Sequence, residues 1–237
     1  MNVKLREFLN YVIVSIFAGV MVALGALGNL VAIGDGSKLL GSIFFSFGLF
    51  FTVLFSLKMY TGMTYNLVKF KLKDWYKLVT CFIGNALWVF IICFLAKYTT
   101  LGEEVTLLSE GIMARKFEIG YTNAFCSSLL CGVLIVISIK SYALAPDKGL
   151  SGSVAVMLPV IIYVYLGLDN GVANWAYIFL SSSWTTECLI YVVLTVIGNI
   201  LGGMILSAGL KFIKQKQESK DSFFFTKFWA FIKKFLI

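Results

Sequence analysis

A short polar break interrupts an apolar stretch of the sequence and is the first place where chemistry could occur. Residues 158–175 read LPVIIYVYLGLDNGVANW, with glycines on either side of the pair Asp169-Asn170. Glycine is a poor helix former, and Asp and Asn side chains compete for backbone hydrogen bonds, so a helix is expected to break there. Inside a membrane, irregular backbone is tolerated only where protein buries it or where it lines a water-filled cavity. The break therefore predicts half of a permeation pathway.

A second break is expected in the apolar segment 39–68, which is too long for one simple crossing. This segment contains Lys58, and we place the break just after it, at Tyr60-Thr61-Gly62. Interrupted segments at matching positions in two inverted halves of a chain are the best sequence pointer to a transporter's binding site.

The spans that follow the two breaks also match each other, because each contains a Gly-Asn pair, at Gly84-Asn85 and Gly198-Asn199. Each half holds three spans, and an odd number gives the halves opposite topology. We therefore predict inverted repeats at about 10–97 and 119–210, which make a channel domain over 1–212, followed by a cytoplasmic tail over 213–237.

Composition indicates an integral membrane protein with an all-α fold. The chain has 237 residues, of which 59% are hydrophobic and 14% charged, whereas soluble domains carry about 25% charged residues. The mean hydropathy of +0.90 agrees. At about 20 residues per span, six transmembrane helices fit. We expect them at 10–33, 39–68, 78–97, 119–139, 150–180 and 187–210, with loops between them, the longest an acidic loop before the fourth span.

The side chains that usually build catalytic or metal sites are scarce. The chain has no histidine, and its five cysteines lie in or beside apolar runs without metal-ligand spacing. We expect free thiols, no metal, no cofactor and no enzymatic activity, because a membrane-embedded enzyme would have no clustered acids or activated nucleophile to use.

Charge predicts the orientation of the chain. The net charge of +8 could suggest nucleic acid, but most basic residues lie at span ends and in the tail. The positive-inside rule then places both termini in the cytoplasm. The tail after residue 222 is both apolar and basic, which is typical of an amphipathic helix on the inner leaflet of the bilayer.

The order and spacing of these segments resemble the formate/nitrite transporter family, which includes the hydrosulfide channels. The resemblance covers about residues 8–212. Besides the first break and the Gly-Asn pairs, the segments that carry it are 18–23, 45–49, 114–116, 158–160, 167–174 and 202–203. It implies an aquaporin-like homopentamer whose subunits each have a pore for small monovalent anions.

Two apolar constrictions of the pore are implied by the same resemblance. Phe45 and Tyr163 would form the outer one, and Leu49 and Tyr60 the inner one. A tyrosine at 163 either adds a hydroxyl group or only fills volume.

The polar residues of the pathway are assigned by resemblance as well. Thr61 would face Asn170 across a central chamber, and Asn174 would support the broken helix. Lys116 would be a vestibule lysine that concentrates anions near the mouth, although a solvated lysine beside Glu118 is the alternative.

The chain departs from the family pattern at three positions. Asn170 stands where the family usually has a histidine, and an amide cannot take up a proton, so a proton relay through this position is not expected. Lys58 stands where the family usually has Asp or Glu. It would supply part of the missing positive potential; alternatively it snorkels or pairs with an acid at the pentamer interface. Gly132 replaces an asparagine, which we interpret as a packing difference.

The substrate remains open among formate, nitrite, hydrosulfide, acetate, lactate and chloride. A structural or partner-binding membrane subunit that has lost transport is the alternative function. The Lys-, Phe- and Ile-rich composition suits a bacterial inner membrane, and composition leaves a eukaryotic microbe open.

Overall fold

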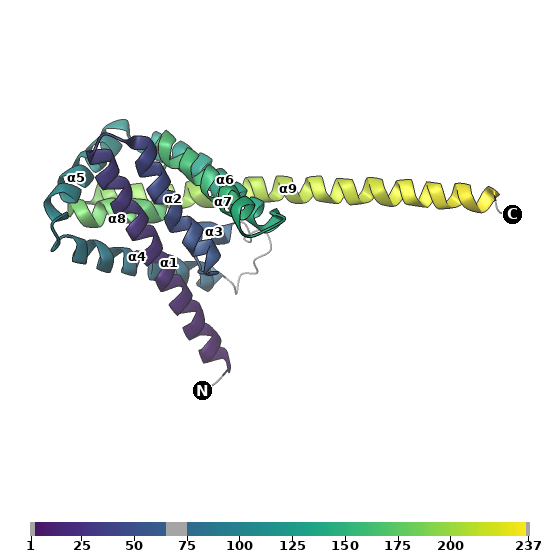
Figure 1. Ribbon diagram of the computed structural model, residues 1–237, viewed down its shortest axis with the longest axis horizontal. Coiled ribbons are helices and arrows are strands. Elements are labelled where there is room, and N and C mark those ends of the chain that lie inside the picture. The colour runs from purple at the N-terminus through teal and green to yellow at the C-terminus, as the bar shows by residue number, and fades with distance from the viewer. Residues whose placement is uncertain (1–2, 65–74, 236–237) are drawn as a thin grey trace.

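The computed structural model describes residues 3–64 and 75–235, with side chains for 5–64 and 75–215, and every regular element in these ranges is a helix. Figure 1 shows a helical bundle from which the end of the last helix projects. The helices are α1 (Val3–Gly34), α2 (Lys38–Leu54), α3 (Tyr60–Met63), α4 (Trp75–Ala96), α5 (Gly102–Ile119), α6 (Tyr121–Leu144), α7 (Leu150–Leu166), α8 (Gly171–Ser181) and α9 (Thr186–Phe235).

Two groups of helices form the bundle, one from each half of the chain. In the first group α1 packs against α2 and α4, and in the second α6 packs against α7 and α9. Contacts of α2 with α7 and of α4 with α8 join the groups. The matching pairs confirm the predicted all-helical fold built from two similar halves.

Most of the described helices are suited to a membrane. Four of them, α1, α4, α6 and the first part of α9, are long and apolar enough to cross it, and α7 with α8 forms a fifth candidate, bent by 52°. The apolar helix α2 has only 17 residues. The second predicted span, 39–68, therefore needs α3 in addition to α2 to reach the length of a crossing. Its last residues, 65–68, lie outside the described residues.

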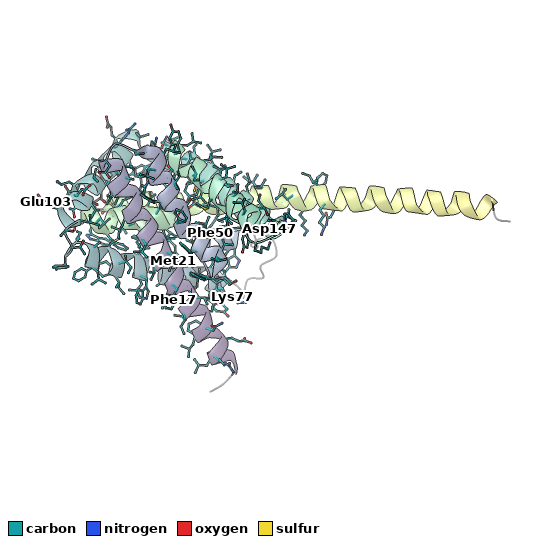
Figure 2. The ribbon with its side chains drawn as sticks, viewed as in Figure 1. Phe17, Met21, Phe50, Lys77, Glu103 and Asp147 are labelled. Carbon is teal, nitrogen blue, oxygen red and sulfur yellow. The ribbon has the colours of Figure 1, made fainter. Side chains whose placement is uncertain are left out.

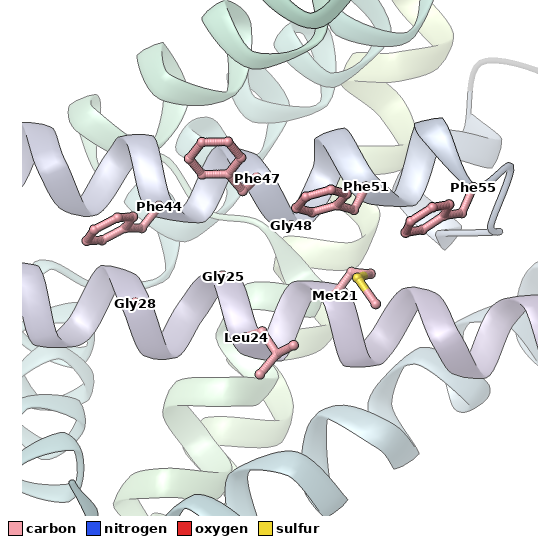
Figure 3. A pocket seen from close by; sticks show the side chains of 9 residues that line it. All are labelled: Met21, Leu24, Gly25, Gly28, Phe44, Phe47, Gly48, Phe51 and Phe55. Atoms are coloured by element: carbon pink, nitrogen blue, oxygen red, sulfur yellow. The ribbon is translucent and has the colours of Figure 1, made fainter.

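The surface of the bundle is apolar, as contact with lipid or with another apolar surface requires. Figure 3 shows a groove between α1 and α2, where a row of phenylalanines on α2 lies beside a glycine-rich stretch of α1. The phenylalanines are Phe44, Phe47, Phe51 and Phe55, and all four are exposed.

The two breaks differ in how well they were predicted. The prediction at 60–62 was wrong in position, because α2 ends at Leu54, Ser56 has a positive φ of 56°, and α3 begins at Tyr60. The second break is confirmed, with non-helical residues between Leu166 and Gly171. There Gly167 ends α7 in the left-handed conformation, which glycine adopts without steric cost.

Two segments are more helical than expected. The predicted acidic loop is largely helix α5, whose first turn holds Glu103 and Glu104 and whose last turn holds Lys116, in keeping with the helix dipole. The tail is helical as expected, but it is continuous with span six, since α9 runs unbroken to Phe235.

The positions of three labelled side chains agree with the expected arrangement of the loops. Figure 2 shows Lys77 and Asp147 towards the end of the bundle from which α9 projects, and Glu103 at the opposite end. The start of α4 and the connection after α6 therefore share one side. Most of the expected basic loop 69–77 lies outside the described residues.

Close backbone contacts set the distance between helices within each half. A Cβ atom added to Gly19 of α1 would collide with the backbone carbonyl of Asn85 in α4, and one added to Gly132 of α6 would collide with that of Asn199 in α9. Small residues permit this approach in membrane helices. The packing role expected for Gly132 agrees with this geometry.

Replacing Gly19 or Gly132 by alanine is expected to destabilise the fold by about 1–3 kcal/mol, because the new methyl group must displace a backbone carbonyl. Gly111→Ala is the matched control, since a Cβ at Gly111 meets open space. Thermal unfolding of the purified protein in detergent measures the difference. Equal melting temperatures for all three variants would contradict the close-packing argument.

Candidate functional site

The first break is held by the side chain of Asn85 in α4. Its Oδ1 atom accepts a hydrogen bond from the Tyr60 backbone N–H (3.0 Å), and its Nδ2 group donates to the carbonyls of Lys58 (3.0 Å) and Ser15 (2.6 Å). Asn85 is fully buried. One amide thus satisfies both a donor and an acceptor that the break leaves without helical partners.

Asn199 in α9 does the same at the second break. Its Oδ1 atom accepts from the Gly171 backbone N–H (2.9 Å), and its Nδ2 group donates to the carbonyls of Asp169 (2.9 Å) and Ser128 (2.7 Å). The two Gly-Asn pairs that the sequence singled out therefore have one structural role. They fix the N-termini of the short helices α3 and α8.

Tyr60 joins the two breaks. Its backbone N–H is bound by Asn85, while its hydroxyl group donates to Oδ1 of Asn199 (3.0 Å). A Cβ on Gly171 would collide with this hydroxyl, so the glycine makes room for it. We expected Tyr60 to line the inner constriction, but its hydroxyl is occupied in connecting the two halves.

Asn170 caps the N-terminus of α8. Its Oδ1 atom accepts from the backbone N–H groups of Val172 (2.9 Å) and Ala173 (3.3 Å). This is ordinary N-capping by asparagine, which satisfies N–H groups in the first turn of a helix. Its side chain lies beside Tyr163 and Cys131. Capping uses the oxygen of this amide and does not involve its nitrogen.

Thr61 lies in the first turn of α3 with its side chain fully buried. Its hydroxyl group has no hydrogen-bond partner among the described residues. A buried hydroxyl without a partner is costly, and such groups are usually satisfied by protein or water. The Thr61 hydroxyl is thus a buried hydrogen-bonding group that the described residues leave unsatisfied.

Asp169 is the centre of a buried polar cluster that the sequence-based list of site residues omitted. Its carboxylate is only 2% exposed and forms an ion pair with Lys116. It also accepts hydrogen bonds from Ser127 (2.6 Å), Asn174 (3.1 Å) and Tyr191 (2.8 Å). Its position in the break could have indicated Asp169, but most of its partners are distant in sequence.

This cluster changes the interpretation of Lys116. The lysine side chain is 15% exposed and directed to Asp169, so it is not the solvated lysine beside Glu118 that was the alternative. Its charge is compensated by the carboxylate. Asn174 lies beside the break through its contact with Asp169.

The remaining predicted site residues are either buried apolar or aromatic side chains or, in the case of Lys58, exposed. Phe45 and Tyr163 are buried and meet edge to face, with ring centroids 6.1 Å apart. Leu49 is buried, as is Met59, which occupies the N-cap position of α3. Lys58, in contrast, has an exposed side chain, and only its backbone joins the network.

Among the described residues no group of His, Cys, Asp and Glu side chains could hold a metal ion. The site therefore consists of two helix N-termini, amide and hydroxyl groups and one compensated charge. Asparagine side chains already bind N–H groups at the starts of α3 and α8, so the unpartnered Thr61 hydroxyl is the donor of this arrangement that could bind a small anion.

Comparisons with known proteins agree with this geometry. The family model described as "Formate/nitrite transporter" matches residues 2–213. No curated protein matches the sequence. A solved "FNT family ion channel" superposes with a TM-score of 0.77 at 17% identity, covering 89% of this chain and 92% of that one. A "Pentameric formate channel with formate bound" gives 0.73 at 17% identity, covering 92% and 99%.

Lys116→Met is expected to destabilise the protein by about 3–5 kcal/mol, because it leaves the buried Asp169 carboxylate without its counter-ion. Adding Asp169→Asn should restore part of the loss by removing the uncompensated charge. Arg115→Met, at an exposed position of the same helix, is the control. Thermal unfolding in detergent compares the native protein, the two single variants and the double variant. Equal losses of stability in Lys116→Met and Arg115→Met would contradict the ion-pair argument.

Tyr60→Phe is expected to lower stability by about 1 kcal/mol, because it removes one buried hydrogen bond and keeps the ring. Tyr98→Phe, at a surface position, should have no measurable effect. The same unfolding assay tests this pair. A Tyr60→Phe variant as stable as the native chain would show that the hydroxyl bond between the halves is dispensable.

Proposed function

Because this chain belongs to the formate/nitrite transporter family, we propose that it is a membrane channel for small monovalent anions, with one pore in each subunit of a homopentamer. The assembly is proposed by analogy with the solved pentameric formate channel, which has the same fold. Transport through such a pore needs no covalent step, and we assign no enzymatic activity to the chain.

The observation that carries this proposal is the buried hydroxyl of Thr61 in the first turn of α3, which has no partner among the described residues. The helices α3 and α8 both start where the two halves meet, and Tyr60 links them through Asn199. A bare anion inside a membrane is costly unless donors replace its hydration. Thr61 and the amide nitrogen of Asn170 are donors of this kind.

The apolar side chains around this polar centre act as barriers to charge. The edge-to-face pair of Phe45 and Tyr163 would form one barrier, and Leu49 with Met59, at the start of α3, would form the other. Constrictions of this kind control conduction in channels by excluding water. An anion would lose part of its hydration at the constriction and regain hydrogen bonds at Thr61.

Asn170 determines which proton-dependent mechanisms are available. An amide does not titrate, so the centre of this pathway cannot hold a proton as an imidazole would. We propose that the substrate crosses as the anion. The substrate class includes formate, nitrite, hydrosulfide, acetate, lactate and chloride, and both termini are proposed to lie in the cytoplasm of a bacterium whose inner membrane holds the channel.

Purified protein in liposomes should carry formate, and Thr61→Val should reduce the flux about tenfold or more. The reason is that valine keeps the shape of threonine but removes a hydrogen bond to a charged group, which is worth about 1.5–3 kcal/mol. Thr61→Ser retains the hydroxyl group and is the control. Native liposomes no more permeable than empty ones would overturn the proposal and favour a subunit without transport activity.

The form in which the substrate crosses is tested by varying pH at a constant concentration of the formate anion. Current should change by less than about twofold between about pH 6 and about pH 8, a range that brackets an ordinary histidine pKa. Electrically silent flux that rises steeply in acid would contradict transport of the anion and indicate passage of the neutral acid.

A further inference from the structure

The hydrogen bonds of Asn85 and Asn199 define which residues of the two halves are equivalent. Each asparagine accepts from the first N–H of a short helix, at Tyr60 or Gly171. Each also donates to the carbonyl two residues earlier, at Lys58 or Asp169, and to a serine carbonyl in the first helix of its half. Lys58 and Asp169 therefore occupy the same position in the two repeats.

The equivalent positions carry opposite charges in very different surroundings. The Asp169 carboxylate is buried and bound by Lys116 and by three neutral donors. The Lys58 side chain is exposed and, among the described residues, forms no ion pair. One break thus contains a compensated charge, and the other contains a cation with no acid beside it in the described part of the chain.

Two polar partners of Asp169, Asn174 and Ser127, have apolar counterparts at the first break. Asn174 lies three residues after Gly171, and the residue three after Tyr60 is Met63. Met63 accepts a hydrogen bond from Tyr11 instead of offering one to the break. At this position the first break therefore has a thioether in place of an amide that could bind a charged group.

The residue equivalent to Ser127 reinforces this difference. Ser128 corresponds to Ser15, because both carbonyls accept from the paired asparagines, so Ser127 corresponds to Val14. The backbone carbonyl of Val14 accepts from the Lys58 N–H (3.2 Å), and its side chain has no group that could bind a charge as Ser127 does. The Lys58 side chain itself is exposed.

We propose that Lys58 is an anion-capture residue at the mouth of the pore on the side of α3, where it recruits small monovalent anions in their ionised form. This rests on the proposed channel function and gives it a specific residue. Lys58 precedes Thr61 by only three residues. An anion captured at Lys58 would therefore be held near the segment that carries the unpartnered hydroxyl.

The physics distinguishes capture from conduction. An uncompensated charge raises the local concentration of counter-ions, and so the rate of association, without changing later barriers. The effect weakens as salt shortens the Debye length from about 10 Å at 0.1 M to about 3 Å at 1 M. Lys116 cannot act in this way at full strength, because Asp169 neutralises it.

The experiment measures formate uptake as a function of formate concentration in liposomes of uncharged lipid that contain the purified full-length chain. Lys58→Gln should raise the half-saturating concentration about threefold to tenfold and leave the maximal rate unchanged. Lys58→Asp, which recreates the charge of the other repeat, should raise it further. Lys58→Arg should behave like the native chain because it keeps the charge.

The control for general surface charge is Lys211→Gln, an exposed position on α9 that should leave uptake unchanged. At about 1 M of an impermeant salt the Lys58 variants should converge on the native curve.

An unchanged half-saturating concentration in Lys58→Gln would overturn the inference, and so would a shift that does not respond to salt or a fall in maximal rate alone. Absence of flux in the native protein would instead overturn the channel function on which the inference rests.

Discussion

Backbone hydrogen bonding in a dry interior is the constraint on which the rest of this structure depends. A helix that breaks among apolar side chains leaves N–H and C=O groups that neither lipid nor neighbouring apolar residues can satisfy. Asn85 and Asn199 solve this with the two ends of an amide, which is at once a donor and an acceptor. Neither Asp nor Leu of similar size could do both.

The polar centre follows from that solution. Because the N-termini of α3 and α8 are fixed by the asparagines, Thr61 and Asn170 are held at defined positions near the junction of the two halves. Asn170 is also committed to capping its own helix, which limits how its side chain can turn. The site is therefore set by the backbone of the breaks more than by side-chain packing around it.

Much of this could be predicted from sequence where the local chemistry is distinctive. Glycines around Asp169-Asn170 mark the second break correctly because both residue types disfavour a helix. The first break was misplaced, since Phe55 to Met59 contains no glycine or asparagine and takes its shape from Asn85, which is distant in sequence. The helix α5 was missed because its polar composition resembles a loop.

The partners of Asp169 illustrate a second limit. Sequence spacing can bring Asn174 near Asp169, because Asn174 lies about one helical turn after the N-cap residue of α8. It contains no information on Tyr191 or Ser127, which reach the carboxylate only after α9 and α6 have packed. Long-range polar contacts of this kind depend on tertiary structure.

The sequence separations of these hydrogen bonds have a consequence for the order in which the chain folds. Asn85 lies 25 residues from Tyr60, and Asn199 lies 28 residues from Gly171, so each break can close within its own half. The bond between Tyr60 and Asn199 spans 139 residues. Closing a long loop costs more entropy than closing a short one, so this contact is expected to form last. During synthesis the first half can complete its own break before α9 exists, and the junction between the halves forms only when the last span is in place.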